Sequence, residues 1–320
     1  MKITRDMAHP DLQPAFNQMK LFPLLVKPRW MTKLLNRALN LGKGKDIDGL
    51  RCDEKHIPSN HDDYAIRIRI YRPLDQEGEL PILLYIHGGG YITGSPEMSA
   101  DAIEGFIKAR PCIVVAPDYR KSYTRPFPAG LNDCYDTLLW AQANAAQLNG
   151  RADKLVVAGH SAGGGLTAAV TLKARDTGDV NIAFQMPIYP MIDDLQPSDP
   201  ERDISAPVWD TDINRVAWKA YLADLHKDGA GIPAYAAPAR NLDYRGFPPT
   251  ITFVGDMEPF YRETLNYVDA LRRENVEVAF KEYAGCFHGF DMLAPESDIG
   301  KDALAFTYDT FAEFLDRYLG

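Results

Sequence analysis

Short apolar runs alternate with longer helical patterns over most of the chain. The runs are rich in β-branched residues and mostly apolar, as is typical of strands covered on both faces. They occupy residues 82–86, 112–116, 155–158, 182–188, 250–254 and 276–283. Helical periodicity falls between or after them, at about residues 98–109, 130–147, 162–176, 261–274 and 302–318. This alternation predicts an α/β fold with a mostly parallel central sheet and helices on both faces.

Two segments depart from the alternation. Residues 1–50 hold several helical patterns broken by prolines, which suggests a helical cover rather than a domain with its own core. Residues 190–248 carry helical signals at 209–225 but no strand pattern. A long insertion at the carboxyl edge of a sheet is often a lid or a binding element. We therefore expect a single domain over residues 1–320, with a cap contributed by 1–50 and about 190–235.

One further strand is predicted ahead of the parallel region. Apolar and polar residues alternate from Tyr64 to Ile70, which is the pattern of a half-exposed strand, antiparallel and near an edge of the sheet. Arg67, Arg69 and Arg72 fall on or beside its polar positions. We interpret this short basic cluster as the solvated face of that strand.

The composition indicates which cellular compartment and which classes of binding partner to expect. The formal net charge of −9 argues against a nucleic-acid or anionic-membrane partner, because both need a concentrated basic surface. The four cysteines are scattered, so we expect no metal site and no disulfide framework. The N-terminus carries Asp6 and Asp11 and does not look like a signal peptide, and no apolar stretch is long enough for membrane insertion. We expect a cytoplasmic protein, with a homodimer left open.

A glycine-flanked serine stands at the junction of a predicted strand and a predicted helix. Gly159-His160-Ser161-Ala162-Gly163 follows the apolar run 155–158 and precedes an Ala- and Thr-rich segment. At such a turn the serine backbone is strained, and small neighbours avoid clashes around it. The hydroxyl is then presented at a helix N-terminus, which favours nearby negative charge. This pattern indicates a nucleophile elbow, although alone it also fits an ordinary glycine-rich turn.

A second glycine-rich segment follows the apolar run 82–86. His87-Gly88-Gly89-Gly90 lacks Cβ atoms at three successive positions, so its N–H groups can approach a substrate oxygen. With the N–H of Ala162, the residue after the serine, those of Gly89 and Gly90 would form an oxyanion hole. Packing alone could also require these glycines. The serine elbow favours the catalytic interpretation.

The general base is expected to be His288. Six other histidines are present: His9, His56, His61, His87, His160 and His226. They fall in the N-terminal region, beside the two glycine motifs or at the end of an insertion helix. His288 stands instead on a loop after the last apolar run, in the place of a base that takes the serine proton.

The carboxylate that orients this histidine is less determined. Glu258 precedes a proline, where the backbone is extended and the side chain can be held toward the histidine. Asp256 directly follows the strand glycine and could instead cap the turn. We favour Glu258, with Asp256 as the alternative acid and Asp193 or Asp194 as a third option.

Together these motifs resemble the hormone-sensitive-lipase-like carboxylesterases, also called family IV, of the α/β-hydrolase superfamily. The resemblance covers roughly residues 60–318. Its motifs are His87 to Tyr91 with Gly94-Ser95, Asp118-Tyr119-Arg120, Pro126 to Ala129 with Asp133, Gly159 to Gly164, Gly255 to Pro259 and His288-Gly289-Phe290. It implies Ser161 as nucleophile, His288 as base, the N–H groups of Gly89, Gly90 and Ala162 as oxyanion donors, and a cap.

Three positions depart from the family pattern. The family usually has Asp where Glu258 stands, so the triad geometry must have adjusted to a longer acid. Most members have Asp at the position of His160, which is not a triad position. The family's Leu-Ala-Pro-Glu is replaced by Lys121-Ser122-Tyr123-Thr124, which alters the contact that its glutamate makes and the rim of the pocket.

We therefore expect a serine carboxylesterase that hydrolyses short acyl esters of small molecules, without a cofactor or metal. An amidase or formamidase with the same machinery is the first alternative. A non-catalytic ligand receptor on this fold is the second, and the presence of His288 argues against it. Pocket candidates, chosen by proximity to the motifs, are Tyr123, Tyr189, Trp209, Phe260 and Phe290.

Overall fold

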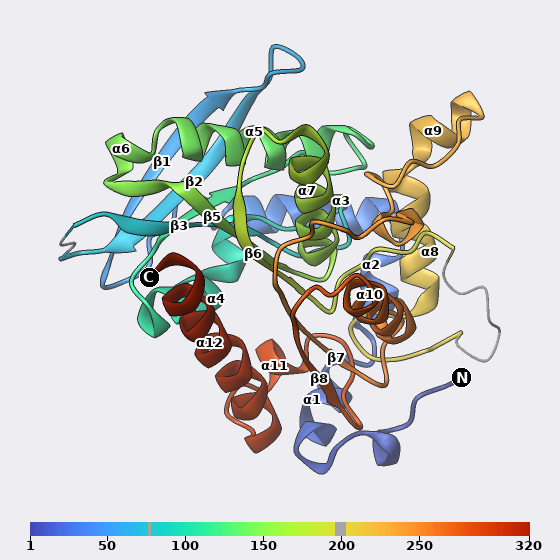
Figure 1. Cartoon of the computed structure of the whole chain (residues 1–320). Coiled ribbons are helices and arrows are strands. Elements are labelled where there is room, and N and C mark those ends of the chain that lie inside the picture. The colour runs from blue at the N-terminus through green and yellow to red at the C-terminus, as the bar shows by residue number, and fades with distance from the viewer. Residues whose placement is uncertain (76–77, 196–202) are drawn as a thin grey trace.

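The computed structural model describes residues 1–75, 78–195 and 203–320 (Figure 1). Their strands form one eight-stranded sheet in the order β1-β2-β4-β3-β5-β6-β7-β8. Both β1 and β4 pair antiparallel with β2, and every other neighbouring pair is parallel. The strands are β1 (Leu50–Pro58), β2 (Ala65–Pro73), β3 (Leu80–Ile86), β4 (Ile113–Pro117), β5 (Gly150–His160), β6 (Ile182–Ile188), β7 (Thr250–Gly255) and β8 (Val278–Tyr283). The predicted α/β fold with a mostly parallel sheet is confirmed.

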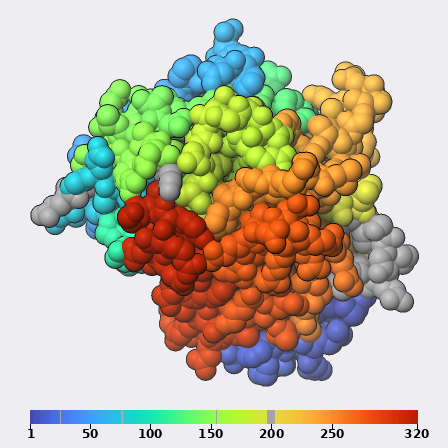
Figure 2. Space-filling view, in the orientation of Figure 1, coloured from blue at the N-terminus to red at the C-terminus, as the bar shows by residue number. Residues whose placement is uncertain are grey.

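Helices cover both faces of this sheet. The α-helices of the described residues are α1 (Gln13–Met19), α2 (Phe22–Val26), α3 (Arg29–Asn40), α4 (Ala100–Ala109), α5 (Ala129–Ala143), α6 (Ala145–Leu148), α7 (Ala162–Thr177), α8 (Thr211–Tyr221), α9 (Ala223–Asp228), α10 (Tyr261–Arg273), α11 (Phe290–Leu293) and α12 (Asp298–Leu319). Helices α5 and α7 pack on one face, and α4 and α12 pack on the other (Figure 1). In the space-filling view the C-terminal part of the chain, orange to red, covers much of the lower half of the molecule (Figure 2).

Alternation along each strand divides the core into two layers. Leu84 of β3 and Val157 of β5 belong to the layer under α5 and α7, whereas Leu83 and Val156 belong to the layer under α4 and α12. Successive side chains of a strand point to opposite faces, so a strand covered on both sides must be apolar throughout. This is why most of the parallel strands are visible in the sequence as mainly apolar runs.

The strand order reverses direction around β3, whose neighbours are β4 and β5. In open α/β sheets, ligands bind outside the carboxyl ends of the strands at such a switch point. The glycine loop follows β3, and Ser161 follows β5. The fold therefore brings both predicted motifs to the same edge of the sheet.

The two segments that depart from the alternation meet in the structure. Residues 1–50 form α1 to α3, and α8 and α9 lie in the insertion. Their contact includes an isolated bridge between Lys2 and Ser205, in which the Ile3 N–H donates to the Ser205 carbonyl at 2.9 Å. Residues 196–202 of the expected cap segment lie outside the described residues. Among the described helices, none combines the length and apolar character that a bilayer crossing requires.

The interpretation of the first antiparallel strand was wrong in one respect. β2 is antiparallel and near an edge, as predicted, but β1 pairs along its outer side and makes β2 an interior strand. Arg69 is consequently buried, with 3% of its surface exposed, rather than solvated. Such a cation needs partners, and the side chain of Asp46 accepts from its guanidinium. The polar composition of β1 gave no apolar run by which to predict it.

Candidate active site

The serine elbow has the predicted strand–turn–helix form. β5 ends at His160, α7 begins at Ala162, and Ser161 between them adopts φ 59° and ψ −122°. A Cβ atom at Gly163 would lie 2.0 Å from the Ile86 carbonyl oxygen, which excludes any side chain there. The strained serine backbone is therefore tolerated because the neighbouring chain can approach it closely.

Two loops from the carboxyl edge bring a histidine and a carboxylate to this serine. The Nε2 atom of His288 lies 2.9 Å from Ser161 Oγ. On the other side of the ring, Nδ1 contacts Oε2 of Glu258, which can only accept when ionised. The second carboxylate oxygen of Glu258 accepts from the Gly255 N–H at 3.3 Å, and the side chain is completely buried. Serine, imidazole and carboxylate thus form a continuous hydrogen-bonded chain.

The other candidate acids have different partners. Asp256 Oδ1 accepts from the Gly285 N–H at 2.7 Å and so anchors the loop that carries His288. Asp193 accepts from the Leu195 N–H at 2.9 Å. Asp194 forms a two-point ion pair with Arg240, at 2.6 and 2.8 Å. Among the four carboxylates considered from the sequence, the structure brings Glu258 to the histidine.

The glycine loop lies directly against the elbow. A Cβ atom at Gly88 would be 3.0 Å from the His160 carbonyl oxygen and 3.4 Å from Ser161 Cβ. Gly89 and Gly90 have φ values of 114° and 59°, which glycine adopts readily. A Cβ atom at Gly90 would also lie 2.1 Å from the Trp209 indole. The glycine loop therefore packs against the elbow, with Gly88 beside Ser161 and His87 beside Gly163.

A family comparison agrees with this geometry. Residues 83–292, which include the glycine loop, the elbow and the histidine, match a family described by its alpha/beta hydrolase fold. The chain belongs to the α/β-hydrolase family. The resemblance to its hormone-sensitive-lipase-like carboxylesterases, drawn from the motifs, is confirmed.

Individual relatives of this α/β-hydrolase are esterases. The chain is 32% identical over 292 residues to carboxylesterase NlhH of Mycobacterium tuberculosis, covering 89% of this chain and 90% of the relative. A solved structure titled bacterial heroin esterase has a TM-score of 0.86 and 30% identity, covering 98% of this chain and 99% of that one. A hyperthermophilic esterase from the archaeon Pyrobaculum calidifontis has a TM-score of 0.81 and 26% identity, covering 96% and 98%.

A small apolar cavity of about 280 Å³ adjoins Ser161 and His288 in this hydrolase. Its floor includes the glycine loop, and Trp209 forms part of the wall. Much of the remaining wall comes from the N-terminal helices α1 to α3, through Met19, Phe22, Val26, Leu35 and Leu39. These wall residues were not predicted from the sequence, where residues 1–50 indicated only a helical cover.

Four of the five aromatic pocket candidates lie elsewhere. Phe260 and Phe290 are fully buried core residues, and the ring of Phe260 contacts the His288 ring edge-on. Tyr189 is also buried and donates to Asp291 at 3.0 Å. Tyr123 lies beside Arg29, which donates to its carbonyl oxygen at 2.9 Å. None of the four lines the cavity beside Ser161, and three of them are packed in the core.

The histidine beside the nucleophile is neutral. His160 Nδ1 lies 2.8 Å from the Tyr85 hydroxyl. Burial lowers the pKa of His160 to about 3, and the nearby His288 acts in the same direction. His160 therefore adds no positive charge to the site, and it lines the cavity without contacting the hydroxyl of Ser161 through any described hydrogen bond.

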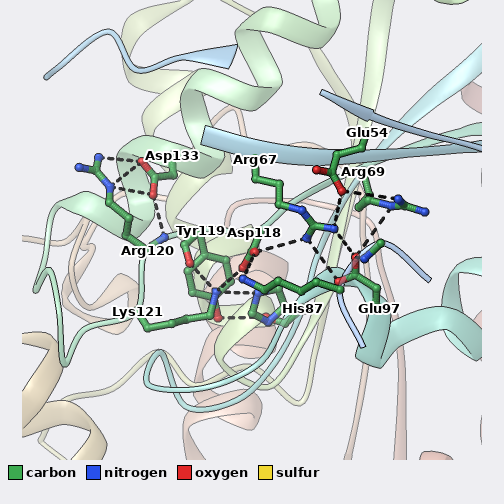
Figure 3. A network of polar contacts seen from close by, with 12 residues as sticks. Glu54, Arg67, Arg69, His87, Glu97, Asp118, Tyr119, Arg120, Lys121 and Asp133 are labelled. Carbon is green, nitrogen blue, oxygen red and sulfur yellow. Dashed lines mark hydrogen bonds and ion pairs between the residues drawn. The ribbon is translucent and has the colours of Figure 1, made fainter. Parts of the chain in front are cut away.

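A polar network that the sequence did not predict holds the first residue of the glycine loop (Figure 3). The ring of His87 stacks on Tyr119, with centroids 4.3 Å apart, and its Nδ1 lies 2.7 Å from the Gly88 carbonyl oxygen. Lys121 Nζ reaches three acceptors: His87 Nε2 at 3.1 Å, Asp118 Oδ1 at 3.1 Å and the Tyr119 carbonyl oxygen. Burial and the Lys121 charge lower the pKa of His87 to about 3. The ring is neutral, with its proton on Nδ1.

The described residues contain no group of three or more His, Cys, Asp or Glu side chains arranged to hold a metal ion. All four cysteines are free thiols, and Cys112, Cys134 and Cys286 are buried.

Proposed function

We propose that this protein is a serine carboxylesterase that cleaves short-chain acyl esters through an acyl-enzyme intermediate. A carboxylic ester hydrolase on the α/β-hydrolase fold follows from its family and its relatives. The observation that carries the finer proposal is the continuous chain from Ser161 Oγ through both nitrogens of His288 to the buried carboxylate of Glu258.

In the acylation step, Ser161 attacks the ester carbonyl while His288 Nε2 takes the hydroxyl proton. Glu258 holds the ring in the tautomer that leaves Nε2 free to accept, and it stabilises the imidazolium that forms. The N–H groups of Gly89, Gly90 and Ala162 receive the developing oxyanion, and each such donor lowers the barrier by about 2.7–4 kcal/mol in comparable enzymes.

His288 then returns the proton to the leaving alcohol oxygen, and the acyl group stays on Ser161. Water repeats the sequence: His288 takes a proton from it, the hydroxyl oxygen attacks the acyl carbonyl, and the acid leaves as Ser161 regains its proton. Each half-reaction thus uses the same base, first as acceptor and then as donor. No redox step or external co-reactant other than water is needed.

The size and lining of the cavity support compact substrates. A volume of about 280 Å³ is at the lower end of ordinary ligand sites. Its walls are mainly apolar, which suits a short acyl chain and a small alcohol. We therefore propose a preference for acetyl to butyryl esters, which a series of p-nitrophenyl esters from acetate to decanoate tests. A maximum at the decanoate would contradict it.

We further propose that residues 1–50 and about 190–235 act as a cap on a single catalytic domain. Support comes from the contact between Lys2 and Ser205 and from the side chains that both segments supply to the cavity wall. The free cysteines suit a reducing compartment, so we propose a cytoplasmic location.

The nucleophile is tested with Ser161→Ala. This change removes one hydroxyl from the elbow, so folding should be unaffected while hydrolysis of p-nitrophenyl acetate falls to background. A fluorophosphonate probe should label the parent protein at Ser161 and leave the variant unlabelled. Retained turnover in the variant, or no labelling of the parent protein, would refute the proposal; the second result would favour the receptor alternative.

A further inference from the structure

The overall negative charge of the chain hides a strongly basic segment. Residues 12–45 contain seven Lys and Arg residues and no Asp or Glu, in a chain whose net charge is −9. The expectation of no nucleic-acid or anionic-membrane partner rested on the net charge of the whole chain. In the structure, part of this segment faces a second and larger cavity, of about 640 Å³, behind the glycine loop.

Three cations from two different elements converge on this cavity, which we term the cationic cleft. Lys33 and Arg37 stand one turn apart on α3, and Arg125 comes from the loop after β4. Their spacing places the two α3 residues on one face of the helix. Within the described part of the chain, none of the three forms an ion pair. Their charges are therefore available to a ligand.

The other cations that line the cleft are already paired. Arg120 donates to both oxygens of Asp133, from Nη2 to Oδ1 at 2.7 Å and from Nε to Oδ2 at 3.0 Å. Asp118, the one carboxylate among the described lining residues, pairs with Lys121 (Figure 3). It also pairs with Lys43. Burial would raise the pKa of Asp118, but Lys121 and Lys43 outweigh it and hold that pKa well below its usual range. These pairs leave Lys33, Arg37 and Arg125 as an excess of positive charge in the cleft.

The cationic cleft is separate from the catalytic cavity. Leu35 and Leu39, on the other face of α3, line the wall beside Ser161. Asn36 lies between the two, donating to the Ile92 carbonyl oxygen at 2.9 Å and accepting from the Thr93 hydroxyl at 2.6 Å. A ligand in the cleft would therefore contact α3 and the 118–125 loop without touching the nucleophile.

We propose that the cationic cleft binds a small multivalent anion, carrying either phosphoryl or several carboxylate groups. Arg37 and Arg125 present planar donor forks that match phosphate and carboxylate oxygens, and Lys33 adds a third point of positive charge. Three convergent cations favour a ligand with several negative charges over a simple halide. The concave shape favours a molecule of metabolite size over an extended polymer.

Isothermal titration calorimetry tests this proposal on the full chain, with inorganic pyrophosphate and citrate as probes at constant ionic strength. The test variant is Lys33→Gln/Arg37→Gln/Arg125→Gln. The matched control, Lys227→Gln/Arg262→Gln/Arg273→Gln, removes the same number of charges from exposed cations that form no ion pair among the described residues. Both variants change exposed side chains, and thermal unfolding verifies that each remains folded.

We expect saturable binding of at least one probe, weakened about tenfold or more in the cleft variant and changed less than about twofold in the control. Tighter binding of pyrophosphate assigns a phosphoryl ligand, and tighter binding of citrate assigns a polycarboxylate. The absence of saturable binding by either probe, or equal weakening in both variants, would overturn the proposal. Equal weakening would show only the general electrostatic field of the protein.

Discussion

The carboxylate of Glu258 accepts a hydrogen bond from Nδ1 of His288, and no part of the glutamate side chain reaches solvent. Its other oxygen is held by the Gly255 N–H. A buried carboxylate fixed at both oxygens cannot rotate away from the imidazole, so the histidine tautomer is also fixed. The longer acid reaches the ring from a position at which the family usually has aspartate.

This geometry predicts that Glu258 and Asp256 differ sharply in their effects on catalysis. Glu258→Gln keeps an acceptor but removes the charge that stabilises the imidazolium, so kcat for p-nitrophenyl acetate should fall about 10³- to 10⁴-fold. Asp256→Asn keeps an oxygen that can accept from the Gly285 N–H and should change kcat less than about threefold. Steady-state kinetics of both variants provide the measurement.

The variant Glu258→Asp tests the assignment of Glu258 and Asp256 in a second way. Shortening the acid by one methylene should restore part of the activity lost in Glu258→Gln, because the charge returns at a less favourable distance. A larger loss of kcat in Asp256→Asn than in Glu258→Gln would reverse the assignment of the two carboxylates.

Burial explains which strands the sequence could predict. β3 to β7 were predicted because strands covered by helices are mostly apolar, and their glycine-rich or loop ends mark the carboxyl edge of the sheet. The edge strand β8 was predicted from its apolar residues although Lys281 and Glu282 interrupt them. β1 was missed because Arg51, Asp53, Glu54 and Lys55 give no apolar pattern, and the strand is recognised only through its pairing with β2. The same pairing converts Arg69 from an expected surface residue into a buried one.

The candidate site shows the same limit. Ser161, Glu258 and His288 could be placed at one edge because each follows a predicted strand. The cavity wall could not be predicted that way, since a motif's neighbours in sequence alternate between the site and the core. Phe290 follows the His288-Gly289 pair yet packs against Phe253 in the core, while helices more than a hundred residues away line the cavity.

The glycine loop gives a prediction about backbone position. In Gly90→Ala the new Cβ would lie 2.1 Å from the Trp209 ring, so the loop or the indole must move. Displacing one oxyanion donor should lower kcat about 10²- to 10³-fold. The measurement is kcat for p-nitrophenyl acetate, together with urea unfolding.

A matched control is Gly229→Ala. Gly229 has φ 65°, close to the 59° of Gly90, but a Cβ there meets nothing within 4 Å. Both substitutions should cost about 1–2 kcal/mol of stability through backbone strain, and only Gly90→Ala should impair catalysis. Equal kcat values in the two variants would remove Gly90 from the proposed oxyanion hole.

The polar network predicts a positioning role for Lys121. Lys121→Met keeps the aliphatic stem but removes the donor to His87 Nε2, which frees the ring to change tautomer and release the Gly88 carbonyl. We expect kcat to fall between about 10- and 100-fold, with a smaller change in KM, because small displacements of a catalytic loop are costly.

The variant Lys43→Met distinguishes the loss of the Lys121–His87 contact from a general loss of positive charge. Lys43 also pairs with Asp118 but makes no described contact with His87. It should therefore change kcat less than about twofold, since Asp118 keeps Lys121 and Arg67 as partners. If both variants lose activity equally, the charge balance of Asp118, and not the orientation of His87, is responsible.

Asp291 predicts how stability depends on pH. Burial raises the pKa of its carboxyl from 3.8 to about 6, against the opposing effect of the Tyr189 hydroxyl that donates to it. Because the folded pKa lies above the unfolded one, the stability contribution of the protonated form is complete below about pH 4 and is lost as pH rises through about 6.

In Asp291→Asn the side chain stays neutral and keeps an acceptor for Tyr189. The free energy of unfolding should therefore rise by about 3 kcal/mol at about pH 8 and by about half as much near pH 5. Urea unfolding at both pH values measures this, with the exposed Asp309→Asn as a control that should show no such difference. A gain in Asp291→Asn that is equal at the two pH values would show that the carboxyl is not titrating in this range.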